Sequence, residues 1–261
     1  PVPEVAVVTL NRPERMNSMA FDVMVPLREH LEEIGHDNSV RAVVLTGAGR
    51  GFSSGADQKS VGPIPYVEGL TRPTYGLRTM ELLDEVILTL RRLHQPVIAA
   101  VNGAAIGGGL CLALACDLRL ASPAAYFRAA GINNGLTASE LGLSYLLPRA
   151  IGQSRAAEIM LTGRDVDAEE AERIGLVSRL VATEDLLTEA VALGRRIAEF
   201  SRPGVELTKR SLWSSLDAGS LESHLQLEGL GQLYVRLLTS NFEEATAARK
   251  EGREPRFTDE L

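Results

Sequence analysis

The segment 95–117 constrains the fold more than any other part of the chain, because no side chain from 97 to 116 is charged. Residues 97–101 form a short apolar run with β-branched side chains, bounded by proline and by Asn-Gly, which is typical of a buried strand. Residues 110–116 are apolar on every face, which predicts a helix inside the core. The segment therefore predicts a buried strand, a glycine turn and a buried helix.

Four glycines separate this strand from this helix: Gly103, Gly107, Gly108 and Gly109. Without a Cβ, glycine lets a ligand approach the backbone closely. The first amides of the following helix have no intrahelical partner and lie at the positive end of its dipole, which favours negative charge there. Asn102 and the four glycines disfavour a membrane-spanning helix. The spacing of the glycines, G-x-x-x-G-G-G, differs from the G-x-G-x-x-G motif of dinucleotide-binding proteins. Close helix–strand packing remains an alternative to anion stabilisation.

Composition excludes some classes of function. Of the 261 residues, 45% are hydrophobic and 23% are charged, which is ordinary for a soluble globular protein with one large core. The net charge of −7 and the lack of a concentrated basic face disfavour nucleic-acid binding. Cys111 and Cys116 lie five residues apart on one predicted helix, so they are poorly placed to pair and fit a reducing cytoplasm. No Cys/His cluster has metal-ligand spacing, so no metal site is predicted.

A second segment repeats the plan of the first. Residues 40–46 are a predicted strand, followed by the glycine-rich loop 47–57. Similar units can stack side by side, so that each loop presents one backbone N–H to a shared point. Two converging amides stabilise an oxyanion when a thioester or ester carbonyl takes on negative charge.

The remaining periodicity predicts a mixed core followed by helices. Residues 61–75, with three prolines, are predicted as a mobile loop that could cover a binding site. The change to helices alone near residue 201 divides the chain into a core at 1–200 and a helical region at 201–261. Leucines at 225–238 exceed what one helix face needs, so they either self-associate or pack on the core. Strands are predicted at 5–10, 40–46, 97–101, 117–121, 126 onward and 176–181, and helices at 20–36, 77–93, 110–116, 139–147, 153–161, 168–174, 183–201, 203–216, 221–238 and 241–251.

Longer motifs resemble the crotonase superfamily, the enoyl-CoA hydratase/isomerase family. They lie at 43–49 with 52–57, 96–103 with 107–109, 116–117, 146–152, 161–164 and 175–177, in the family's order over nearly the whole chain. The resemblance implies an α/β fold, a spiral of repeated ββα units with an all-helical C-terminal region used in trimers or dimers of trimers. It also implies an acyl-CoA substrate, with coenzyme A as part of the thioester and no tightly bound cofactor.

Site residues follow from the same resemblance, motif by motif. The two amides that hold the thioester oxygen belong to Ala56 and Gly108. Positions where the family contacts coenzyme A correspond here to Arg15, Ser54, Ala56, Asp57 and Gln58.

The chain departs from the hydratase pattern at both catalytic glutamates, where it has Cys111 and Gly131. Hydration needs one group to activate water and one to protonate carbon, and this pair cannot do so. Glu140 aligns with the catalytic aspartate of other family branches and is the expected acid/base, which suits double-bond isomerisation. The alternatives are that Glu140 only stabilises a helix start after Ser139, and that the protein binds acyl-CoA without chemistry. Cys111 could be a nucleophile but is expected to be a packed thiol.

Overall fold

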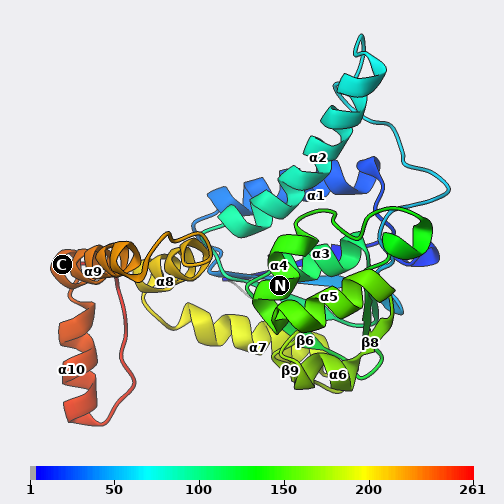
Figure 1. Ribbon diagram of the computed structural model, residues 1–261. Helices are drawn as coiled ribbons and strands as arrows, with labels where there is room; N and C mark the ends of the chain where they lie inside the picture. The colour runs from blue at the N-terminus through cyan, green and yellow to red at the C-terminus, as the bar shows by residue number, and fades with distance from the viewer. Residues whose placement is uncertain (1–3) are drawn as a thin grey trace.

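Two β-sheets form the centre of the computed structural model, which describes residues 4–261 (Figure 1). The five-stranded sheet is entirely parallel, in the order β1-β2-β4-β6-β9. The four-stranded sheet, β3-β5-β7-β8, is parallel except for its last pair. The strands are β1 (Val5–Leu10), β2 (Ala42–Gly47), β3 (Gly51–Ser53), β4 (Val97–Val101), β5 (Ala104–Ile106), β6 (Leu118–Ala121), β7 (Tyr126–Arg128), β8 (Asp165–Asp167) and β9 (Arg179–Leu180).

From β2 to β7, consecutive strands alternate between the two sheets. Each of the pairs β2–β3, β4–β5 and β6–β7 contributes its first strand to the large sheet and its second to the small one. A helix follows each of the first two pairs, α2 (Arg72–Arg92) and α3 (Gly108–Ala115). This repeat is the expected ββα unit, and the α/β fold class is confirmed. The carboxyl ends of β2 and β4 therefore lie beside each other, and each is followed by a glycine loop.

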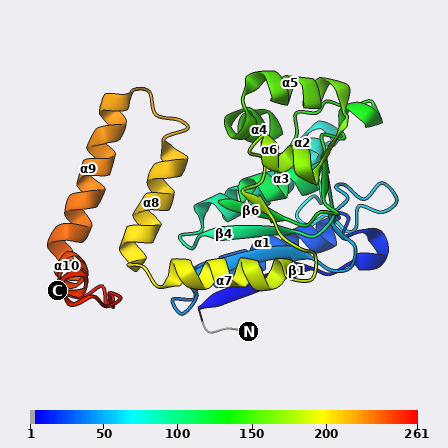
Figure 2. The same cartoon turned by 90° about the horizontal axis from the view of Figure 1, so that it is seen from below.

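Both faces of the large sheet are covered. On one face Val43, Leu45 and Val97 belong to the main core with α1 (Phe21–His36), α2 and α3. On the other, Val44 and Ile98 pack with α7 (Leu186–Ala198), which runs along the sheet in Figure 2. Because strands buried on both faces are continuously apolar, β2 and β4 were recognisable from the sequence. The other helices of the core are α4 (Leu143–Ile151), α5 (Gln153–Thr162) and α6 (Ala168–Arg173), with 3₁₀ turns at Pro13–Arg15 and Ile132–Asn134.

Some predicted boundaries were wrong. The segment taken as the loop 61–75 ends in helix, since α2 begins at Arg72 with Pro73 in its first turn, where a missing N–H is harmless. Helix α4 begins at Leu143 rather than Ser139, after Gly142 in the left-handed conformation. Thr183 does not cap α7, which begins after Asp185. The strands β3, β5 and β8 have three residues each and carry too little periodicity to be recognised.

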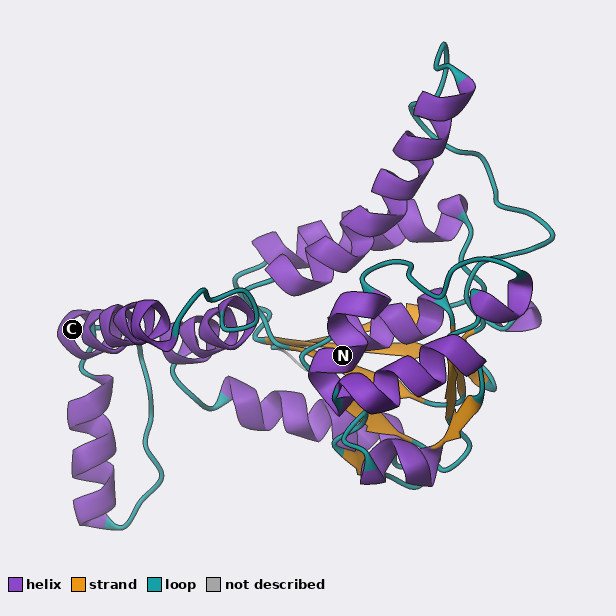
Figure 3. Cartoon of the chain, in the orientation of Figure 1, coloured by secondary structure: helices purple, strands orange, loops and turns teal. Residues whose placement is uncertain are grey.

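The chain beyond residue 201 is helical and stands away from the sheets, as Figures 2 and 3 show. It contains α8 (Arg202–Ser214), α9 (Leu221–Leu238) and α10 (Asn241–Glu251). Helix α8 is held to the core by Asp117, which lies 2.8 Å from Lys209 Nζ and accepts a 2.6 Å hydrogen bond from Trp213. The division at 200/201 stays a prediction, and residues 1–3 of the first unit lie outside the described residues. Within residues 4–261, every helix is too short or too polar to cross a membrane.

Candidate functional site

The two glycine loops meet at Gly55. This residue has φ = +78°, and a Cβ on it would lie 2.5 Å from Ile106 O and 3.3 Å from Gly108 N. Any side chain at position 55 would therefore collide with the backbone of the second loop. The structure thus places Gly55, the residue before Ala56, against the backbone of Gly108.

The N–H groups of Ala56 and Gly108 are the donors expected to hold the thioester oxygen. Neither donates a hydrogen bond to another residue of the described chain 4–261. Gly108 is the first residue of α3, so its amide has no intrahelical acceptor. Ala56 is exposed, whereas Gly108 is buried, so one of the two amides lies at the surface and the other in the core. Two such donors can stabilise charge that develops on a carbonyl oxygen.

Glu140 lies against the second glycine loop. A Cβ on Gly107 would be 3.1 Å from Glu140 Oε1, so the carboxylate lies directly beside this glycine. The residue is half-buried, and burial raises the pKa of its carboxyl. It is not part of a helix, because α4 starts three residues later, so the expected alternative of a stabilised helix start does not describe it. A carboxyl with a raised pKa beside this loop can take a proton when it is ionised and return one when it is protonated.

Cys111 and Gly131 do not supply a second acid or base. The Cys111 side chain is fully buried, and burial raises the pKa of its thiol well above the usual value, with the Glu140 charge adding to the effect. Such a thiol remains protonated and packed, as expected. A Cβ on Gly131 would lie 1.9 Å from Thr137 O, so no larger side chain fits there unless the loop moves.

The residues expected to contact coenzyme A surround Ala56 but differ in exposure. Gln58 is exposed, Ser54 is half-buried, and the side chain of Arg15 is 30% exposed. The Asp57 carboxylate is buried and is engaged by Arg15 at 2.5 Å. A contact between Asp57 and coenzyme A would therefore come from the backbone. Their roles in binding coenzyme A stay predictions.

Two residues beside Ala56 had not been anticipated, Ser18 and Met19. The Met19 N–H donates to Gly55 O (2.7 Å), and Met19 O accepts from the Asp57 N–H (2.9 Å). Ser18 donates to the Asp57 carboxylate at 3.2 Å. No local pattern in the sequence could reveal these contacts, because the partners lie about forty positions apart in an irregular turn.

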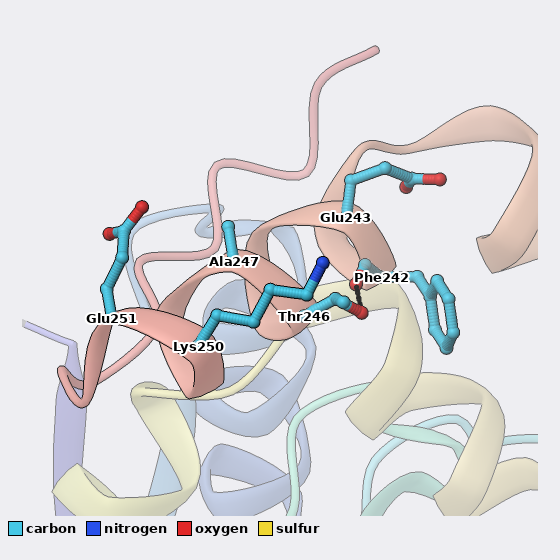
Figure 4. A pocket seen from close by; sticks show the side chains of 6 residues that line it. All are labelled: Phe242, Glu243, Thr246, Ala247, Lys250 and Glu251. Atoms are coloured by element: carbon cyan, nitrogen blue, oxygen red, sulfur yellow. Dashed lines mark hydrogen bonds between the residues drawn. The ribbon is translucent and has the colours of Figure 1, made fainter.

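Two surface pockets lie away from the glycine loops. Figure 4 shows one on α10, where Lys250 lies between Glu243 and Glu251. A larger groove of about 740 Å³ lies between α8 and α9. Neither is lined by a residue of the glycine loops, and no group of three or more His, Cys, Asp and Glu in residues 4–261 could hold a metal ion.

Comparison with known proteins places this geometry in a family. The model of the enoyl-CoA hydratase/isomerase family matches residues 3–260. A probable enoyl-CoA hydratase of Mycobacterium bovis is 77% identical over 260 residues, which are 100% of this chain and 91% of that protein. The crystal structure of a probable enoyl-CoA hydratase/isomerase from Mycobacterium abscessus is 75% identical with a TM-score of 0.96, covering 100% of this chain and 98% of that one.

A second solved structure carries a narrower description. The crystal structure of a monofunctional enoyl-CoA isomerase from Mycobacterium smegmatis is 69% identical, with a TM-score of 0.74 over 86% of this chain and 95% of that one. The family match extends over both sheets and the C-terminal helices alike. The chain therefore belongs to the enoyl-CoA hydratase/isomerase family.

Proposed function

We propose that this protein is an enoyl-CoA isomerase, which moves the double bond of a 3-enoyl-CoA thioester to the 2-position. The observation that carries the proposal is a single carboxylate, Glu140, which lies beside Gly107 in the glycine loop whose Gly108 amide, like that of Ala56, donates no hydrogen bond within residues 4–261. The similarity to a monofunctional enoyl-CoA isomerase supports it.

One carboxylate is sufficient for this reaction. Ionised Glu140 takes a proton from C2 of the thioester, and the electron pair of that C–H bond moves toward the carbonyl oxygen. The N–H groups of Ala56 and Gly108 stabilise the resulting dienolate. Protonated Glu140 then returns the proton at C4, the double bond settles between C2 and C3, and the carboxylate is regenerated. Nothing is consumed, and no tightly bound cofactor is needed.

Hydration makes a different demand. Adding water across a double bond needs a base for the water and an acid for the carbon, and the two positions that would supply them carry Cys111 and Gly131. The test is to assay the purified protein with a 3-enoyl-CoA and with crotonyl-CoA. We expect turnover of the first and little hydration of the second. Hydration as fast as isomerisation would contradict the proposal.

The absence of both glutamates also supports a second candidate, an acyl-CoA-binding protein without catalytic activity. Calorimetry separates the two candidates. Tight acyl-CoA binding with no turnover of any thioester in a panel would favour the second, whereas turnover of 3-enoyl-CoA excludes it.

The pH dependence of isomerisation follows from the raised pKa of Glu140. The base form must be ionised, so kcat/KM should rise with pH and reach a plateau above the pKa of this carboxyl. Because burial raises this pKa from 4.5, the half-maximal rate should lie above pH 4.5. The measurement is a kcat/KM profile with a 3-enoyl-CoA. A rate that is independent of pH down to pH 4.5 would contradict this assignment.

The C-terminal helices are proposed to form the interface of a cytoplasmic trimer or dimer of trimers. Helix α9 has no buried residue, and its leucines face water in the single chain; Leu230 and Leu237 are 68% and 67% exposed. An 18-residue helix with leucines around its circumference is stable only when another surface covers it.

Charge on this helix should dissociate the assembly. Burial of one leucine contributes about 1.5–3 kcal/mol, so Leu230→Arg with Leu237→Arg should lower the association constant at least about a hundredfold. Sedimentation velocity should show a trimer or hexamer for the wild type and a smaller species for the variant. Leu161→Arg on α5, where the leucine is 75% exposed, is the matched control and should leave the mass unchanged. A monomeric wild type would contradict the proposal.

A further inference from the structure

The turn 12–19 contacts the first glycine loop and orients Ala56. The carbonyl oxygen of Met19 accepts a hydrogen bond from the Asp57 N–H, and the Met19 N–H donates to Gly55 O. These two bonds form a parallel β-bridge between Met19 and Ala56. In such a bridge the neighbours of Ala56 bond to Met19, and the N–H of Ala56 points to the opposite side. The direction of this amide therefore depends on where Met19 lies.

Met19 also touches the second loop. A Cβ on Gly108 would lie 2.4 Å from Met19 Sδ, and Met19 is buried. One residue thus contacts the loop of Ala56 through its backbone and the loop of Gly108 through its side chain. Its position determines how the two amides face each other.

The Asp57 carboxylate fastens this turn to the loop. Oδ2 lies 3.0 Å from Arg12 Nη1 and accepts the Ser18 hydroxyl at 3.2 Å. Oδ1 accepts Arg15 Nη2 at 2.5 Å. All three partners belong to the turn 12–19, which includes two consecutive non-glycine residues in the left-handed conformation, Met16 and Asn17. An irregular turn of this kind persists only when surrounding contacts hold it.

The same carboxylate also organises its own loop. Oδ1 accepts the backbone N–H groups of Lys59 (2.9 Å) and Ser60 (3.1 Å). The hydrogen bond from the Lys59 N–H contributes most to lowering the pKa of Asp57, and the bonds from Ser60, Arg15 and Ser18 add to it. Together they hold this pKa well below its usual value, so Asp57 stays ionised. With both oxygens engaged and the residue 5% exposed, this side chain has no free acceptor for a ligand.

We propose that Asp57 is a positioning residue, whose carboxylate holds the turn 12–19 against the first glycine loop and so sets the direction of the Ala56 N–H. This inference rests on the proposed function, in which that N–H stabilises the dienolate. It separates Asp57 from the neighbouring positions expected to bind coenzyme A, because its side chain acts through Met19 and Ala56 and not on the ligand.

The test is the variant Asp57→Asn. A shift of an amide by about 1 Å can reduce the rate about a hundredfold, so kcat for a 3-enoyl-CoA should fall by about that factor. Calorimetry should show a much smaller change in the Kd for free coenzyme A than in kcat, because the Asp57 side chain has no free acceptor for this ligand. The milder variant Ser18→Ala removes one of the bonds to the carboxylate and should lower kcat in the same direction by less, which keeps the test open if Asp57→Asn does not fold.

The matched control is Glu170→Gln. Glu170 is half-buried and, like Asp57, accepts hydrogen bonds from an arginine, Arg164, at 2.7 and 2.8 Å, but it lies on α6. We expect this variant to lower the melting temperature and to leave kcat unchanged. If Asp57→Asn behaves like the control, losing stability and keeping kcat, the proposal is overturned.

A second readout does not depend on turnover. Acetoacetyl-CoA is a thioester whose enolate absorbs in the near ultraviolet, so its ionisation on the protein reports the two amides directly. The wild type should bind it as the enolate, and Asp57→Asn should lose that signal while still binding coenzyme A. Weaker coenzyme A binding with an unchanged enolate signal would make Asp57 a binding contact and overturn the proposal.

This readout also separates the two proposals. A wild type that turns over no thioester but forms the enolate, with the signal lost in Asp57→Asn, would end the isomerase proposal and support the positioning role. A wild type that isomerises 3-enoyl-CoA, with kcat and the enolate signal both retained in Asp57→Asn, would overturn the positioning role alone.

Discussion

The Glu140→Gln variant should isomerise 3-enoyl-CoA at least about a hundredfold more slowly than the wild type, because general acid–base catalysis by one group contributes about 10²–10⁴. Glutamine keeps the size of the side chain and removes its ability to carry a proton. Since the same carboxyl takes the proton from C2 and returns it at C4, both half-reactions fail together. Steady-state kinetics should show the loss in kcat, with KM nearly unchanged.

The same substitution should not destabilise the protein at neutral pH. Burial raises the pKa of Glu140 in the folded state, so between pH 4.5 and the raised pKa the folded protein binds more protons than the unfolded chain. The free energy of unfolding therefore falls as pH rises through this window, and above the raised pKa the wild type bears the full cost of the buried charge. Glutamine removes this cost. Its melting temperature should equal or exceed that of the wild type at pH 7, and the difference should vanish below pH 4.5.

A matched control is available on α2. The pKa of Asp84 is also raised by burial, followed by the charges of Glu85 and Glu81, but Asp84 is no neighbour of Gly107. Asp84→Asn should likewise retain or gain stability at pH 7, and it should isomerise at the wild-type rate. If Glu140→Gln retained full activity, the acid/base role would be wrong and the single-carboxylate mechanism with it.

The sequence predicted the large sheet and the meeting of the two loops for one reason. Both β2 and β4 are buried on two faces, so each is a continuous apolar run, and each is followed directly by glycines. Stacking of such units predicts that the two loops lie together without any knowledge of the intervening chain, and the family resemblance assigns the two amides to Ala56 and Gly108. The strands β3 and β5 escaped notice because three residues inside a glycine-rich loop carry no period.

The network around Asp57 could not be predicted in the same way. Its partners Arg12, Arg15 and Ser18 lie 39 or more positions away, in a segment that consists of one short 3₁₀ turn and irregular backbone. The family resemblance predicted that Asp57 and Arg15 contact coenzyme A. Only the three-dimensional structure shows that their side chains form an ion pair with each other. The placement of Glu140 beside Gly107 likewise depends on Gly142 and the late start of α4, which the sequence pattern placed four residues too early.

The Gly55→Ala variant should lose about 10²–10³ in kcat, which is the effect of removing one donor from an oxyanion hole. The added Cβ would lie 2.5 Å from Ile106 O and 3.3 Å from Gly108 N, so the loops must separate, and they carry the two amides apart. A shift of this kind weakens the hydrogen bonds from the two amides to the charged dienolate more than those to the uncharged substrate. The loss should therefore appear in kcat, and the acetoacetyl-CoA enolate signal should fall with it.

The conformation of Gly55 complicates this test, because alanine at φ = +78° is itself strained by about 1–2 kcal/mol. Gly252→Ala is the matched control: it has φ = +68° at the end of α10, and nothing lies within 4 Å of its added Cβ. Gly252→Ala should lose only the stability that the left-handed conformation costs, Gly55→Ala should lose at least as much, and only Gly55→Ala should lose activity. If Gly55→Ala does not fold, Gly108→Ala replaces it, since its Cβ meets only the movable end of Met19 and the side chain of Leu141. A folded Gly55→Ala protein with full kcat would mean that the two amides do not act as a pair, and the oxyanion hole would have to be abandoned while the fold assignment survives.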